Sequence, residues 1–157
     1  MAATTLHVGT GVDTRDFAAF AKALRVSAPD IWVDLRAGLR VAGQAVAARA
    51  RRNAAAIPGK NRTDRIEQSI KVRVSGTGTV SVIAGGLRAP EAGPLENKGR
   101  LGEFRHPVFG NRQLWVKQLA HPFLTPAVKD GMPEASQAAV DALDRAVTRA
   151  ATLFLED

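Results

Sequence analysis

Residues 29–56, PDIWVDLRAGLRVAGQAVAARARRNAAA, carry the strongest helical pattern in the chain. Apolar side chains recur every three or four positions, at Trp32, Leu35, Leu39 and Val46, which is the spacing of one helix face. Proline followed by aspartate suits a first helical turn, and the arginines near residue 50 complement the negative end of the helix dipole. At a rise of about 1.5 Å per residue, the segment predicts a helix of roughly 38 Å that forms a spine across one face of the protein.

Two alternating segments follow this helix. Within residues 69–85, SIKVRVS and TVSVIAG place Val72, Val74, Val80 and Val82 on one side, and GTG lies between the two segments. Apolar residues that alternate around a glycine-rich turn predict a β-hairpin with one face buried. We therefore expect an α+β fold in which a small antiparallel β-sheet packs against the long N-terminal-half helix and a long C-terminal helix.

The sequence predicts less regular structure for residues 1–28, 60–65 and 86–124. Residues 1–28 are expected to be an N-terminal extension with a short helix that starts at Asp13 or Thr14. Residues 60–65, KNRTDR, are polar and turn-like, and predict a linker loop that leads into a helical turn around Asp64 to Gln68. Residues 86–124 are rich in glycine and proline, and predict a long loop or arm.

Residues 125–155 predict the second long helix. Thr125 and Pro126 suit a helix start, whereas Gly131 and Pro133 threaten a break. From Pro133 onward the apolar residues again repeat in threes and fours, and the predicted buried face consists of Val140, Leu143, Val147, Ala150 and Phe154.

Composition limits the classes of function. A chain of 157 residues fits one domain, residues 1–157, and its +7 charge and pI near 10.8 invite a nucleic-acid interpretation. A basic charge alone does not identify the partner. The chain has two Trp, six Phe and no Tyr, so few aromatic rings are present on which single-stranded bases could stack. The apolar stretches are too short to span a membrane and the N-terminus lacks a secretion-signal pattern, so we expect a soluble, intracellular protein.

No catalytic or metal-binding motif emerges. The chain has no cysteine, and its three histidines, His7, His106 and His121, are scattered, which makes a zinc site improbable. The carboxylates and serines form no recognisable paired or nucleophilic signature, and the two GxG sequences lack the spacing of a phosphate-binding loop. We expect no cofactor and no enzyme.

Residues 104–128, FRHPVFGNRQLWVKQLAHPFLTPAV, combine aromatic residues with two His-Pro pairs in a pattern too irregular for a helix or a simple strand. Together with the preceding segments, the chain resembles the small neck proteins of long-tailed bacteriophages, the gp-ten-like tail-completion family, over residues 28–150. After the first helix, the family's spacing is kept by Pro58, Thr63, Ile66, Ser69 and Ile70, with Asp64 in place of a glycine; Glu96 and Gly99 match a later corner more loosely. The stronger match, to the variant common in phages of actinobacteria, consists of Arg105, His106, Pro107, Gly110, Trp115, Pro122, Phe123, Leu124, Pro126 and Ala127.

The resemblance implies a structural role without catalytic residues. Proteins of this kind assemble as a ring, usually of six, at the head–tail junction of the virion, after synthesis in the host cytoplasm. The implied partners are other copies of the chain and the stopper, terminator and tail-tube proteins, with DNA passing through the lumen in weak, nonspecific contact at most. The predicted interface residues are Glu96, Phe104, Arg105, His106, Phe109, Trp115, His121 and Phe123.

Other interpretations stay open at this point. Phe123 and Leu124 could instead fill the core of their own subunit, because Pro126 starts a helix directly behind them. A tail terminator from the same neck region would have a similar architecture. Outside that class, a basic nucleic-acid-binding module and, last, a small hydrolase or nuclease remain as alternatives.

Overall fold

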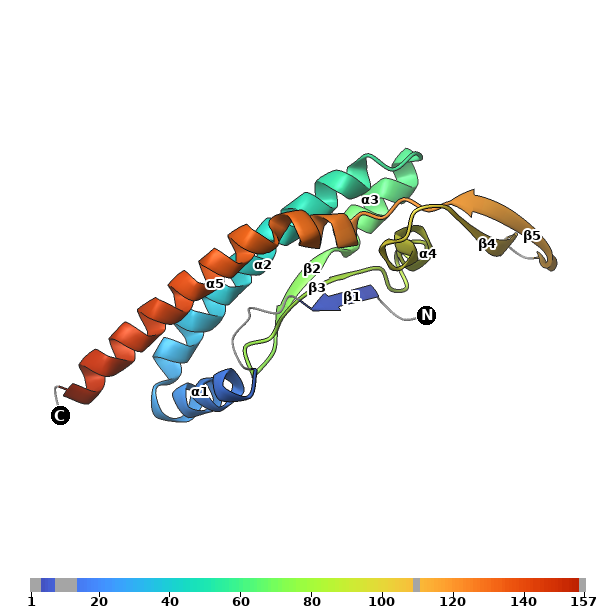
Figure 1. Ribbon diagram of the computed structural model, residues 1–157. Helices are drawn as coiled ribbons and strands as arrows, with labels where there is room; N and C mark the ends of the chain where they lie inside the picture. The colour runs from blue at the N-terminus through green and yellow to red at the C-terminus, as the bar shows by residue number, and fades with distance from the viewer. Residues whose placement is uncertain (1–3, 8–13, 109–110, 156–157) are drawn as a thin grey trace.

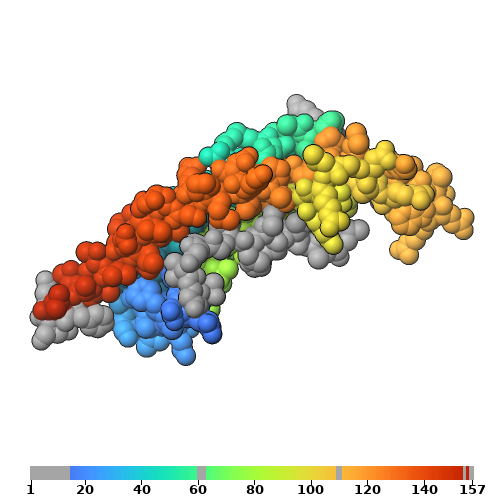
Figure 2. Space-filling view, viewed as in Figure 1, coloured from blue at the N-terminus to red at the C-terminus, as the bar shows by residue number. Residues whose placement is uncertain are grey.

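The computed structural model describes residues 4–7, 14–108 and 111–155. Two long helices, α2 (Pro29–Ala55) and α5 (Leu124–Leu155), lie side by side and antiparallel, with a small sheet on one side of the pair (Figure 1). The molecule is elongated (Figure 2): α1 (Thr14–Ser27) lies toward one end and a second β-hairpin extends from the other. The predicted α+β class is confirmed.

Helix α2 forms as its sequence pattern predicts. The side chains of Trp32, Leu35, Leu39 and Val46 are all buried, and proline occupies the first turn. This face contacts both α5 and the sheet, which makes α2 the element around which the others pack. Burying each of these large side chains contributes roughly 1.5 to 3 kcal/mol to folding.

The sheet contains the predicted hairpin and one strand that the sequence pattern did not reveal. Strands β2 (Lys71–Val74) and β3 (Val80–Ala84) pair as expected, and β1 (Thr4–His7) pairs with the other edge of β3, giving the order β1-β3-β2. The sheet lies very close to α2. A Cβ atom added at Gly43 would come within 2.6 Å of Val72 and 2.8 Å of Val80, so glycine is required at this contact.

Helix α5 buries only part of the predicted face: Ala150 is buried and Leu143 packs partly against the core, while the Phe154 side chain is outside the described part of the chain. Val140 and Val147 are 40% and 48% exposed, so the valine face is wrong as the core face. Small side chains pack against α2 instead, because the two helices lie very close together at Gly38. A Cβ atom added at Gly38 would lie 2.5 Å from the Cβ of Ala142, so a valine side chain does not fit in this seam. The buried residues of this seam are Ala135, Ala139, Ala142, Ala146 and Ala150.

The expected break in α5 does not occur. The helix continues through Gly131 and Pro133, although a proline inside a helix costs about 3 kcal/mol. Gly131 is buried against Val46 and Arg49 of α2, and α5 packs on α2 both before and after the proline. This packing holds the helix together across the missing hydrogen bond.

Residues 60–65 belong to a helix, α3 (Lys60–Ser69), and the predicted linker loop is wrong. Thr63 and Ile66, one helical turn apart, are both buried. The Ser69 hydroxyl donates to the Ile66 carbonyl at 2.6 Å and accepts from the Gly85 amide at 2.9 Å, which ties the end of α3 to the end of β3. Tertiary contacts therefore order a segment whose sequence is polar.

Residues 86–124 are also more regular than the predicted long loop. They contain the short helix α4 (Ala92–Glu96), a 3-10 turn η1 (Asn97–Gly99) and two paired strands, β4 (Glu103–Val108) and β5 (Asn111–Leu119). The prediction of a loop is wrong here, while the strands do form an arm that extends from the body (Figure 1).

Candidate docking surface

The β4–β5 hairpin, which we call the arm, comprises residues 103–119. Its two strands pair with each other and form a sheet separate from the three-stranded one, and most of their contacts are between the two strands. In Figures 1 and 2 it projects beyond the end of the α2–α5 pair. A two-stranded hairpin is marginally stable alone in water, so the arm depends on its base and on whatever covers it.

The register assigns the arm residues to two faces. Trp115 lies opposite Pro107, and His106 lies opposite Val116. Because directly opposed residues share a face and neighbours alternate, Trp115 and His106 lie on opposite faces. A shift in register between Pro107 and Val108 marks an irregularity near the tip.

Each face carries exposed apolar area. Trp115 is 50% exposed and Leu119 59% exposed on one face, while Leu114 is 53% exposed on the other. Val116, which is 37% exposed, adds to the second face, where the rings of Phe104 and His106 lie 5.8 Å apart. Apolar surface exposed to water on a projecting hairpin does not stabilise the subunit's own fold. Such surface is typical of a contact with another protein.

The base of the arm is fixed by buried Glu96. Its Oε2 accepts the amides of Phe123 and Leu124 at 2.8 and 2.7 Å, and its Oε1 accepts the Thr125 amide at 2.8 Å. These amides belong to the start of α5, where backbone N–H groups lack helical partners and the helix dipole favours a negative charge. Glu96 is 1% exposed, so the carboxylate joins α4 to α5 inside the subunit.

Backbone contacts complete the base. The Ala120 amide donates to the Gly102 carbonyl at 2.7 Å, and the His121 amide donates to the Leu95 carbonyl at 2.9 Å. Gly99 has φ +76°, and a Cβ there would lie 2.6 Å from the Thr125 side chain. The glycine that was matched to a family corner thus permits close contact between η1 and the start of α5.

Two predicted interface residues are corrected by these positions. Glu96 and Phe123 are 1% and 0% exposed, so neither can form the surface of an interface. Phe123 packs in the core cluster with Leu124, Leu95 and Ile66, in agreement with the alternative that it fills its own subunit.

The other predicted residues lie on or near the arm. Arg105 and Trp115 are exposed, while Phe104, His106 and His121 are partly buried. Phe104 packs partly against the core, and the His106 Nδ1 donates to the Pro107 carbonyl at 3.0 Å. Phe109 falls outside the described residues.

Sequence reasoning missed three exposed apolar residues on β5: Leu114, Val116 and Leu119. The signal available was NRQLWVKQL itself, a run with aromatic and β-branched residues that favours a strand. The run Leu-Trp-Val does not alternate with polar residues, which hid the strand and also indicates that both of its faces are apolar.

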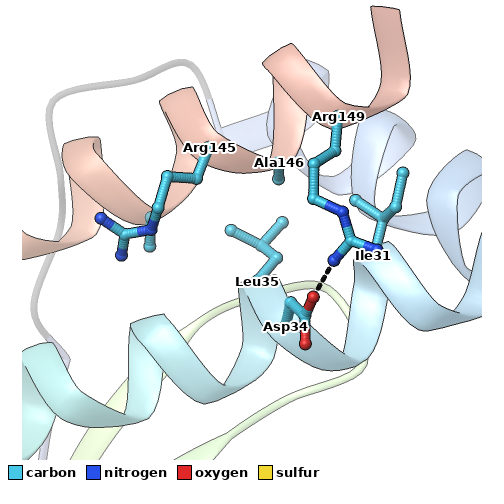
Figure 3. Close-up of a pocket in the computed structure, with 7 residues that line it drawn as sticks. Ile31, Asp34, Leu35, Arg145, Ala146 and Arg149 are labelled. Carbon is cyan, nitrogen blue, oxygen red and sulfur yellow. Dashed lines mark hydrogen bonds and ion pairs between the residues drawn. The ribbon is translucent and has the colours of Figure 1, made fainter. Parts of the chain in front are cut away.

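A hollow of about 200 Å³ lies between α2 and α5 (Figure 3). Its lining includes the buried side chains of Ile31 and Leu35, and Arg149 closes one side by pairing with Asp34. Arg149 also contacts Asp30 at 3.0 Å. Asp34 and Arg149 are paired with each other and the apolar floor belongs to the helix seam, so we assign no ligand to this hollow.

Over the described ranges, no three His, Asp or Glu side chains are grouped so that they could hold a metal ion. None of the helices in the same part of the chain is both long and apolar enough to cross a lipid bilayer. Comparison of the chain with protein-family models, with curated proteins and with solved structures found no match.

Proposed function

We propose that the chain is a structural subunit of a bacteriophage head–tail connector, and that six copies form a ring at the junction of head and tail. The observation that carries the proposal is the arm, which exposes Trp115, Leu114 and Leu119 beyond the body of the subunit. The resemblance of residues 28–150 to tail-completion proteins supplies the class. No catalytic step is assigned to the chain.

The energetics of the arm favour a protein partner. Fully burying one large apolar side chain contributes roughly 1.5 to 3 kcal/mol. Three half-exposed side chains on the arm can therefore contribute several kcal/mol, which is enough to offset the ordering of a short hairpin at a contact. Polar neighbours such as Arg105 and Lys117 keep the free arm soluble.

The position of the arm favours a ring over a symmetric dimer. It lies at one end of an elongated subunit (Figure 2), and we propose that it docks on the body of the next copy, so that the two contacting surfaces differ. Such head-to-tail contacts close into rings when the rotation between copies is right. The remaining faces of the ring would then contact neighbouring neck and tail proteins, with the stopper, the terminator and the tail tube as the proposed partners.

The test is the mass of the assembled species. The purified chain, at high concentration and with purified tail proteins added, is expected to form a discrete ring in light scattering and in negatively stained images. A monomer that persists under all of these conditions would contradict the proposal. A ring of another size would revise the number of copies and leave the arm contact intact.

A further inference from the structure

A basic surface covers the face of the sheet that points away from α2 and continues around the edge strand β2 to Arg36 and Arg40 of α2. It consists of two hollows, of about 590 and about 420 Å³, that share Arg73 and Ile83 in their linings. No aspartate or glutamate of residues 4–7, 14–108 or 111–155 lines either of them. We call this surface the basic face and define it by its cations: Arg36, Arg40, Arg65, Lys71, Arg73 and Arg88.

We propose that the basic face binds the phosphate backbone of duplex DNA. This site is separate from the docking surface on the arm. Its biological setting rests on the proposed function, because a connector ring surrounds the path of the genome, and the basic face would then be the side of the subunit turned to the lumen.

The local sequence determines where these cations lie. In β2, KVRV, Val74 is buried and Val72 packs against the core, so alternation places Lys71 and Arg73 on the opposite, exposed face. Arg36 and Arg40 are four residues apart and share one side of α2, beside the edge strand β2. The Arg36 Nη2 donates to the Val74 carbonyl at 3.3 Å, which places that guanidinium at the sheet edge.

The charge of the basic face is mostly uncompensated. Arg65 pairs with Glu91 at 2.9 Å. Over the described residues, the other five cations form no ion pair with a carboxylate. Like charges gathered in a concave surface repel one another and raise the local positive potential, an arrangement that a polyanion stabilises.

The remaining lining favours phosphate groups over an acidic protein. Besides the cations it offers hydroxyl and amide groups, including Ser75, Thr79 and Gln68, which are the usual partners of DNA phosphates. Among the described residues, no Trp, Phe or Met of the kind that anchors protein contacts lines it, and Leu87 is its large exposed apolar side chain. The absence of aromatic rings also removes a platform for stacking single-stranded bases. A sequence-independent contact with the duplex backbone remains.

The test measures binding of the full-length chain to a fluorescein-labelled DNA duplex by anisotropy as salt is varied. If the five unpaired cations each contact one phosphate, affinity is expected to fall roughly 500-fold between about 50 and about 200 mM salt. Binding that does not depend on salt, or no binding at low salt, would overturn the proposal.

A pair of double variants with equal charge change localises the contact. Lys71→Gln with Arg73→Gln is expected to weaken binding roughly 60-fold at about 0.1 M salt and to reduce the salt slope by about 2. The control, Arg105→Gln with Arg112→Gln on the arm, removes the same charge away from the basic face and should bind like the unmodified chain. Equal losses of DNA affinity in the two double variants would contradict binding at the basic face.

Competitors identify the kind of polyanion. Unlabelled duplex is expected to displace the labelled duplex at lower concentration than single-stranded DNA or polyglutamate does. Equal or better displacement by polyglutamate would overturn the assignment in favour of an acidic protein partner. Failure here is distinct from failure of the proposed function, because a chain that forms rings but does not bind duplex contradicts only this inference.

Discussion

Trp115→Ala is expected to leave the monomer folded and to abolish ring assembly at concentrations where the unmodified chain assembles. The side chain is 50% exposed on the arm and lies opposite Pro107, so its loss removes little of the subunit's own packing. If burying it in each contact contributes about 2 kcal/mol, the concentration needed for assembly rises roughly 30-fold. Light scattering gives the assembly, and thermal unfolding of the monomer gives the fold.

Val41→Ala is the matched control for this variant. Val41 is 66% exposed on α2, so the change also trims an exposed apolar side chain, but on the body of the subunit. It should alter neither assembly nor stability. If Trp115→Ala instead unfolds the monomer, then Trp115 belongs to the core and the arm is no docking surface.

Glu96→Ala is expected to destabilise the subunit by about 4 kcal/mol. The substitution removes the acceptor of three backbone amides at the start of α5 and leaves those buried donors without partners. Urea unfolding of the variant measures the loss. Glu96→Gln keeps one acceptor oxygen and should therefore lose less than Glu96→Ala. It should still be less stable than the unmodified chain, because the amide nitrogen that replaces the second oxygen cannot accept these bonds.

Glu103→Ala makes the same change in charge at an exposed position. Glu103 pairs with Lys117 at 3.1 Å, and both side chains are at least half exposed, so the expected loss is under about 1 kcal/mol. Equal effects of Glu96→Ala and Glu103→Ala would mean that the carboxylate of Glu96 does not hold α4 to α5.

The parts of the fold that were predicted from the sequence are those in which periodicity and burial coincide. The core face of α2 from Trp32 to Val46 and the alternating valines of the β2–β3 hairpin have large apolar side chains directed toward one another. Helix α5 shows where this reasoning fails. Gly38 brings α2 so close that alanines fill the seam, and the larger valines remain outside.

The arm was identified as a surface but not as a hairpin. Both faces of β5 are largely exposed within the subunit, so no alternation of apolar and polar residues marks it as a strand. The role of Glu96 could not be predicted because its partners lie 27 to 29 residues further along the chain. The basic face was hidden for a related reason, since its cations come from α2, α3, β2 and the segment after β3.

The central claim is that the arm is completed by an adjoining subunit. A density map of the assembled ring tests it most directly, because the positions of β4 and β5 can be traced in each copy. The expected result is that Trp115 and its exposed neighbours on the arm lie buried against the next copy or an adjacent neck protein. A map in which the arm contacts only its own subunit would contradict the account.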